Sequence, residues 1–201
     1  RELMERSAKL EPVVAGGDSD LAEVIRIIVE AVPLAERRAT QLRLNAYRPP
    51  EVREWRAAAE ALPADVDDLD AVVDDYHRQA QTFVAGYHAE IPDLLEAEPN
   101  SLPFIDAHFY LRDYTHTKDR ATVEELMVPT LGAHLGTLLE RGLDGRWVPR
   151  RNPDESQVIV GDRAWLPFLR VRHFVQSRQA ALDYSLTRFY REAERHARGQ
   201  G

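Results

Sequence analysis

The sequence predicts an α+β fold that is mainly helical, with N-terminal helices and a small three-stranded antiparallel sheet. Two patterns support this prediction. Apolar residues recur at intervals of three and four as far as residue 141, as in amphipathic helices. After that, short runs rich in β-branched and aromatic residues lie between Gly and Asp turn signals. Because a three-stranded sheet is marginal alone, we expect it to pack on helices over residues 119–141 and 179–197.

Composition is that of an ordinary globular chain. The 201 residues include 26 basic and 34 acidic side chains, for a net charge of −8, and 44% are hydrophobic. There is no cysteine, which excludes disulfides, thiolate metal sites and cysteine nucleophiles. No apolar run approaches the roughly 20 residues of a membrane span, so we expect no membrane partner. The negative net charge argues against nucleic acid as a partner.

The chain divides into three predicted parts. These are a flexible N-terminal arm over residues 1–18, a helical region over 19–114 and an α+β module over 115–201, and we expect the last two to form one compact fold. Charge is also unevenly distributed: residues 1–138 have a net charge of −12 and residues 139–201 a net charge of +4. The simplest interpretation is mutual attraction of the two parts, and a basic surface for an anionic partner is the alternative.

The helices of the first part follow from apolar spacing and from helix-ending residues. Pro33 separates the first two, and Pro49-Pro50 end the second. The longest apolar stripe begins near Leu69, after a run of acidic residues that favours a helix N-terminus. The predicted helix ranges are 20–32, 34–46, 51–62, 67–90 and 102–114. A strand is the alternative for the last of these ranges, which is rich in aromatic residues.

The second part begins with the predicted helix over 119–141. Gly142 and Leu143 are typical of a Schellman stop, in which Gly takes the left-handed conformation. Three extended runs follow, at Arg146–Val148, Gln157–Val160 and Leu166–Val175. The last helix, over 179–197, is predicted to bury leucines and expose arginines.

Short motifs over residues 131–190 occur in a fixed order. They are LGxxLG at 131–136, GxWV at 145–148 and a Pro-Phe pair at 167–168. In this order the segment resembles a family of bacterial proteins with a domain of unknown function. The resemblance implies an α+β module and no known reaction. Members often have an aromatic residue at the position of His134 and an acidic residue at that of Thr137.

Three residues of these motifs are interpreted as structural. Gly132 and Gly136 lie four residues apart, on one helix face, and would let another backbone approach closely. Trp147 is expected to anchor the core between sheet and helix. A shared ligand-binding cleft is the alternative interpretation of all three.

Without thiols, a metal or catalytic site must use His, Asp and Glu. The densest set is Asp106, His108, Asp113, His116 and Asp119, followed by Glu124 and Glu125. The two histidines and Asp113 are candidate metal ligands. Solvated helix ends are the alternative interpretation. Asp106 and His134 are candidate catalytic residues. His134 lies on the apolar stripe of its helix, so it is either a core residue or, near a carboxylate, a general base or pH-sensitive group.

A further pattern lies near the C-terminus. Arg191 and His196 satisfy R-x4-H, the pattern of HEPN-type ribonucleases, in which the two side chains would position and cleave an RNA phosphodiester. This pattern is common by chance in an Arg-rich helix, and the expected strands do not suit that family. It is a remote alternative.

No convergent catalytic set emerges, so we predict a non-enzymatic interaction or regulatory protein, of adaptor or immunity type. Its expected partner is another protein, with homo-oligomerisation open and no cofactor. The alternative is a metal- or small-ligand-dependent enzyme using the Asp/His cluster around residues 106–134. Two lysines among 26 basic residues are typical of a GC-rich bacterial genome. We expect a cytoplasmic protein, with an upstream signal peptide open because the chain begins with Arg1.

Overall fold

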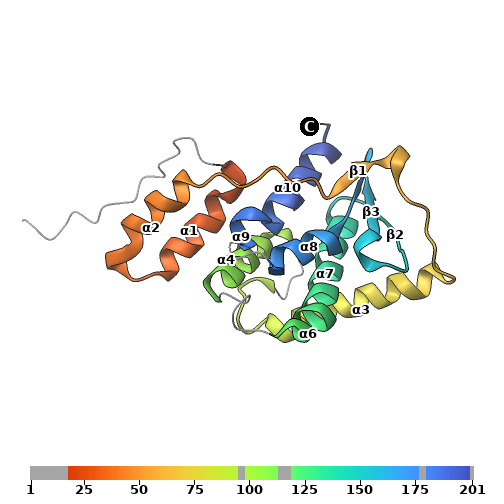
Figure 1. The fold of residues 1–201 in the computed structure, drawn as a ribbon, viewed down its shortest axis with the longest axis horizontal. Coiled ribbons are helices and arrows are strands. Elements are labelled where there is room, and N and C mark those ends of the chain that lie inside the picture. Colours follow the sequence, from red (N-terminus) through yellow and green to blue (C-terminus); the bar gives the residue numbers. More distant parts are fainter. Residues whose placement is uncertain (1–17, 95–97, 113–118, 177–179, 200–201) are drawn as a thin grey trace, which may run out of the picture.

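The computed structural model describes residues 18–94, 98–112, 119–176 and 180–199. They form a mainly helical α+β fold with a small antiparallel sheet, which confirms the predicted fold class. The hairpin of α1 (Ala22–Ala31) and α2 (Leu34–Ala46) lies at one end and the sheet at the other (Figure 1). Apart from Asp18, the predicted N-terminal arm falls outside the described residues. None of the described helices combines the length and hydropathy that a bilayer span requires.

The central element is α7 (Val128–Gly142), in which every residue from Thr130 to Leu139 is buried. It packs against α3 (Leu69–Tyr87), α8 (Pro167–Gln176) and the sheet, so it has no solvent-facing side over these turns. It continues a helical segment made of α6 (Arg120–Thr122) and a π-helical turn over Val123–Met127. Pro129 has no N–H to donate to the preceding turn, and the wider turn accommodates it.

The sheet has the strand order β1-β4-β3-β2, with all neighbours antiparallel. β2 (Arg146–Val148) and β3 (Gln157–Val160) occupy the first two predicted ranges. The predicted third strand over Leu166–Val175 is wrong, because this segment forms α8. Its buried Phe168, Val171 and Phe174 recur at intervals of three, which suits a helical face, and Pro167 fits the first helical turn. The remaining strands are β1 (Trp55–Ala57) and β4 (Arg163–Trp165).

The helix predicted over 51–62 is also wrong. Residues 48–68 form a mostly extended segment, here called the strap, which contains β1 and a 3-10 turn over Ala58–Glu60. The strap runs from the end of α2 to the sheet and then to the start of α3 (Figure 1). Its backbone gains partners by pairing with β4, with Trp55 opposite Trp165. Tertiary pairing therefore decides the conformation of a stretch whose apolar spacing alone favours a helix.

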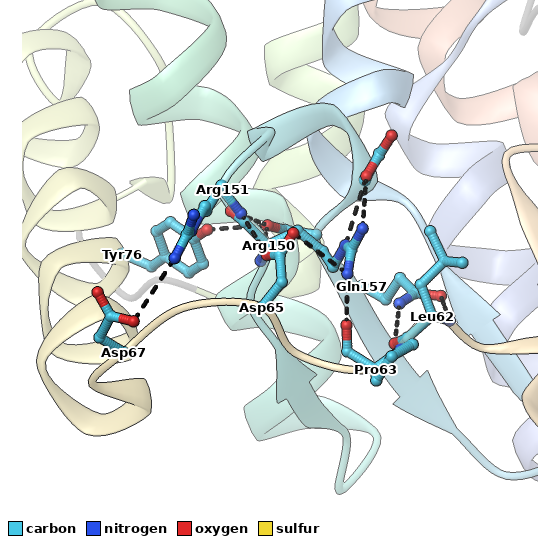
Figure 2. Close-up of polar contacts among 10 residues, drawn as sticks. Leu62, Pro63, Asp65, Asp67, Tyr76, Arg150, Arg151 and Gln157 are labelled. Carbon is cyan, nitrogen blue, oxygen red and sulfur yellow. Dashed lines mark hydrogen bonds and ion pairs between the residues drawn. The ribbon is translucent and has the colours of Figure 1, made fainter.

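Side chains from the β2–β3 region hold the second half of the strap (Figure 2). The Gln157 amide donates to the Leu62 carbonyl at 2.9 Å and accepts from the Leu62 N–H at 3.2 Å. The Arg150 guanidinium donates to the carbonyl of Pro63 at 2.7 Å and forms an ion pair with Asp65 at 3.2 Å. The strap is thus positioned mainly by hydrogen bonds to its backbone.

Helix ends differ from the predictions at two places. The last helix is interrupted, so that α9 (Ala180–Asp183) and α10 (Leu186–Ala197) replace one helix over 179–197. Ser185 separates them because its side chain accepts from the Arg188 N–H at 3.1 Å and caps α10. At the end of α7 the left-handed residue is Asp144, with φ 54°, instead of Gly142. The predicted range 102–114, rich in aromatic residues, forms the helix α4 (Leu102–Arg112). The alternative of a strand over this range is therefore wrong.

Gly132 and Gly136 lie where aromatic side chains press directly on α7. A Cβ atom on Gly132 would lie 2.4 Å from Phe168 Cδ1, and one on Gly136 would lie 2.1 Å from Trp147 Cη2. Trp147 is buried, and its ring centroid lies 4.8 Å from that of Tyr76 and 5.9 Å from that of Phe168. The two glycines therefore bring α7 into contact with α8 and with the sheet.

Gly136→Ala is expected to lower the free energy of unfolding by about 2 kcal/mol, because the new methyl group overlaps the Trp147 ring. Gly86→Ala in α3 is the matched control, since a Cβ there meets nothing within 4 Å. That change should raise stability by roughly 0.5–1 kcal/mol through helix propensity. Urea denaturation measures both, and equal effects of the two substitutions would contradict the proposed packing.

Candidate functional site

The predicted Asp/His cluster does not converge. Asp106 and His108 both lie on α4, but residues two apart on a helix point about 200° apart. Asp113 and His116 lie outside the described residues. Within the described ranges, no three His, Asp or Glu side chains are grouped to hold a metal ion. The candidate residues that the structure describes therefore have separate environments.

Asp106 is fully buried and organises the start of α10. Its carboxylate accepts from Ser185 Oγ at 2.6 Å, from the Leu186 N–H at 2.9 Å and from the Thr187 N–H at 3.1 Å. Burial raises its pKa to about 6, although these hydrogen bonds lower it. Because its oxygens accept from a helix N-terminus, Asp106 has a structural environment.

His108 lies in an aromatic row with Tyr87 and Phe109. Its ring centroid is 5.9 Å from Tyr87 and 5.8 Å from Phe109, and its Nε2 lies 3.8 Å from a Glu90 oxygen. Burial lowers its pKa, as does Arg112, whereas Glu90 raises it. The row continues through Phe83 to His134, so two aromatic rings separate the two histidines. His108 and His134 therefore belong to different environments.

A cavity of about 380 Å³ lies between α3 and α7. His77 of α3 contacts Glu140 of α7, and Phe83 of α3 contacts His134 of α7, so the two helices run antiparallel along it. Its volume lies in the lower part of the range for small-molecule sites. Several lining side chains are exposed, so the cavity opens to solvent. The lining consists of His77, Ala80, Gln81, Val84, Ala85, His88, His134, Thr137, Leu138 and Arg141.

Two buried polar atoms of this lining have no hydrogen-bond partner among the described residues. They are Nε2 of His134 and Oγ1 of Thr137, on residues that are 1% and 5% exposed. Burial lowers the pKa of His134 to about 4, so its ring is neutral at neutral pH. An unpaired buried polar group costs roughly 1–3 kcal/mol, and a bound molecule with matching groups would remove that cost.

The mouth of the cavity carries the remaining polar side chains. His77 Nε2 and Glu140 Oε2 are 2.6 Å apart and link α3 to α7. His88, the residue that follows α3, has its Nδ1 2.9 Å from the Ala85 carbonyl oxygen. Arg141 lies in the last turn of α7, where the helix dipole favours a cation. The cavity thus has an apolar wall, a neutral polar base and a basic mouth.

Only part of this site was accessible to sequence reasoning. His134 was one of the predicted candidates. Thr137 was noted only because the family that this segment resembles often has an acidic residue there, and it was not a predicted site residue. The α3 side chains were missed. Their signal was the spacing of His77, Gln81 and His88 along one helix face. That spacing indicates a shared face without showing that the face borders a cavity.

The R-x4-H residues, Arg191 and His196, do not line the cavity between α3 and α7. Arg191 is exposed, and the His196 ring lies 6.2 Å from Trp55 and 6.1 Å from Trp165. His196 therefore packs on the aromatic residues of the sheet. The ribonuclease alternative stays a prediction that nothing in this geometry favours.

Searches of protein-family models, curated proteins and solved structures gave no match to this chain. The resemblance over residues 131–190 therefore stays a prediction, and the functional argument rests on the geometry of the cavity.

The buried His134 predicts a pH-dependent stability. Its pKa is lowered from 6.5 to about 4, so its stabilising contribution is present above pH 6.5 and lost as the pH falls toward 4. Relative to His134→Leu, the native chain should lose about 2 kcal/mol of unfolding free energy between about pH 7 and about pH 5. Chemical denaturation at several pH values measures this difference.

The comparison with His134→Leu also removes the effect of Asp106. The raised pKa of Asp106 gives a contribution of opposite sign, present below pH 3.8 and lost as the pH rises through about 6. This contribution, like that of His108, is common to both proteins and cancels in the difference. Parallel stability curves for the two proteins would show that His134 is not buried as described.

Thr137→Val is expected to raise the stability of the ligand-free protein by about 1 kcal/mol, because it removes an unpaired buried hydroxyl at nearly constant volume. Thr130→Val on the same helix is the control, since its hydroxyl donates to the Leu126 carbonyl at 2.7 Å. That change should lower stability by a similar amount. Thermal or urea unfolding compares the two, and a loss of stability in both would contradict the unpaired state of Thr137.

Proposed function

We propose that this protein binds a small organic ligand, mainly apolar, in the cavity between α3 and α7, and that it does so without catalysing a reaction. The observation that supports this most strongly is the pair of unpaired buried polar atoms on His134 and Thr137. Both residues line a cavity of otherwise mostly apolar character. A ligand with an apolar body and a hydrogen-bonding group would complement both features.

Water alone is a weaker explanation of the cavity. A single water could pair with the two atoms, and buried waters commonly make about three hydrogen bonds. The volume of about 380 Å³ is, however, far larger than the roughly 30 Å³ that one water occupies in the liquid. Ala80, Val84 and Leu138 also line the cavity and offer water no hydrogen bonds. Displacing water from such walls favours binding of an apolar ligand.

The same geometry argues against catalysis at this site. A general base works best with a pKa near the working pH, whereas that of His134 is lowered to about 4. The Thr137 hydroxyl is not activated by His134, because neither atom has a hydrogen-bond partner. Asp106, the carboxylate proposed to assist His134, is occupied by the start of α10.

The predicted interaction or regulatory role is compatible with ligand binding and stays a prediction. One observation favours it: Leu34 and Leu42 on α2 are 80% and 62% exposed. They lie on the α1–α2 hairpin, at the end of the molecule away from the sheet (Figure 1). Exposed leucines at this place would suit a partner protein, and a ligand between α3 and α7 would then act as its regulator.

Ligand binding can be tested with N-phenyl-β-naphthylamine, an uncharged probe whose fluorescence rises in apolar surroundings. Ala85 is exposed and lines the cavity, so Ala85→Trp should fill the mouth and weaken binding by roughly tenfold or more. Fluorescence titration gives both affinities.

Ala71→Trp is the matched control, because Ala71 is also exposed on α3 but does not line the cavity. It should bind the probe as the native chain does. Circular dichroism confirms that each protein is folded. Absence of probe binding to the native chain, or equal binding by the Ala85→Trp variant, would overturn the proposed function.

A further inference from the structure

We propose that the ligand is an elongated organic anion, with its apolar body and a polar group inside the cavity and its acidic group at the mouth, held by Arg141. This inference rests on the proposed function and specifies its ligand class. It is supported by the charges of the lining, by the lack of a partner for Arg141 among the described residues and by the distance between the polar groups of α7.

The lining contains no carboxylate, although the chain has 34 acidic residues and a net charge of −8. Its one permanent charge is the guanidinium of Arg141. Two further residues of the lining, His77 and His88, are basic side chains at the two ends of the α3 wall. A ligand anion would therefore be attracted to Arg141 at this mouth.

The described residues give Arg141 neither an ion pair nor a side-chain hydrogen bond. Its sequence neighbour Glu140 does not serve as a partner, because the Glu140 carboxylate is engaged with His77 at 2.6 Å. The contact with His77 shows that Glu140 points toward α3. Neighbouring residues on a helix point about 100° apart, so Arg141 has a different direction. By contrast, Arg150 and Arg170 are each bound by carboxylates. Among the residues that the structure describes, none therefore competes with a ligand for the Arg141 guanidinium.

The spacing along α7 sets the shape of the ligand. His134 and Arg141 are seven residues apart, which is close to two helical turns, so both lie on one face about 10 Å apart along the axis. A single inorganic anion at Arg141 cannot also reach the buried polar atoms. An elongated molecule can do so, with its acidic group at Arg141 and a hydrogen-bonding group near His134 and Thr137. Arginine suits this role because its planar fork binds a carboxylate or sulfonate with two parallel hydrogen bonds.

Two matched probes test the inference. The first is the isomer of anilinonaphthalenesulfonate with amine and sulfonate at opposite ends of the naphthalene, and the second is N-phenyl-β-naphthylamine, which lacks the sulfonate. The native chain should bind the sulfonate more tightly than the uncharged probe. Arg141→Gln should weaken sulfonate binding by about fivefold and leave the uncharged probe unchanged. Higher salt should reduce the preference for the sulfonate.

Arg78→Gln is the control, because Arg78 lies on α3 with a side chain 67% exposed and does not line the cavity. It should leave both affinities unchanged. Equal affinity of the native chain for the two probes overturns the anion inference while leaving the proposed function standing. Equal weakening of both probes by Arg141→Gln, or equal effects of the two arginine variants on the sulfonate, also overturns it. Failure of the native chain to bind either probe overturns the proposed function itself.

Discussion

Several separate elements depend on the contacts of one buried group, the guanidinium of Arg170 on α8. It is 3% exposed, donates to the equally buried Glu54 at 2.7 Å and donates to the Ser185 carbonyl at 2.9 Å. Removing both charges from water costs several kcal/mol each, which the ion pair and its accompanying hydrogen bonds must offset. The strap supplies the carboxylate and the turn before α10 supplies the carbonyl. Both segments are therefore fixed against α8.

Asp106 completes this network from α4, on the other side of Ser185. It receives three donors from the residues that begin α10. Among the described residues, both oxygens of Asp106 are paired, whereas His134 Nε2 and Thr137 Oγ1 are not, and neither are Arg170 Nε and Thr187 Oγ1 within the network itself. What distinguishes His134 and Thr137 is that both line the cavity between α3 and α7.

Sequence reasoning succeeded where the relevant information is local. Helical spacing predicted α1, α2 and α3 closely, and turn signals at Asp144 and Gly161 bounded β2 and β3. It failed at the strap, because Trp55 is drawn into the sheet by a strand more than a hundred residues away. It also failed at α8, where the aromatic and β-branched content was given more weight than the spacing of three between Phe168, Val171 and Phe174. Of the site, it identified His134, but the opposing wall on α3 depends on a tertiary contact that no local pattern contains.

The strap has a consequence for how the molecule assembles. Its hydrogen bonds join residues separated by 95 positions at Gln157 and by 116 at Arg170. Contacts of such separation repay their loop-closure entropy only once the β2–β3 hairpin and α8 are already in place. We therefore expect the strap to form late, and until it docks, β4 would present an open strand edge and Arg170 would lack its carboxylate. The interval before docking is the stage at which this chain is most exposed to pairing with another strand.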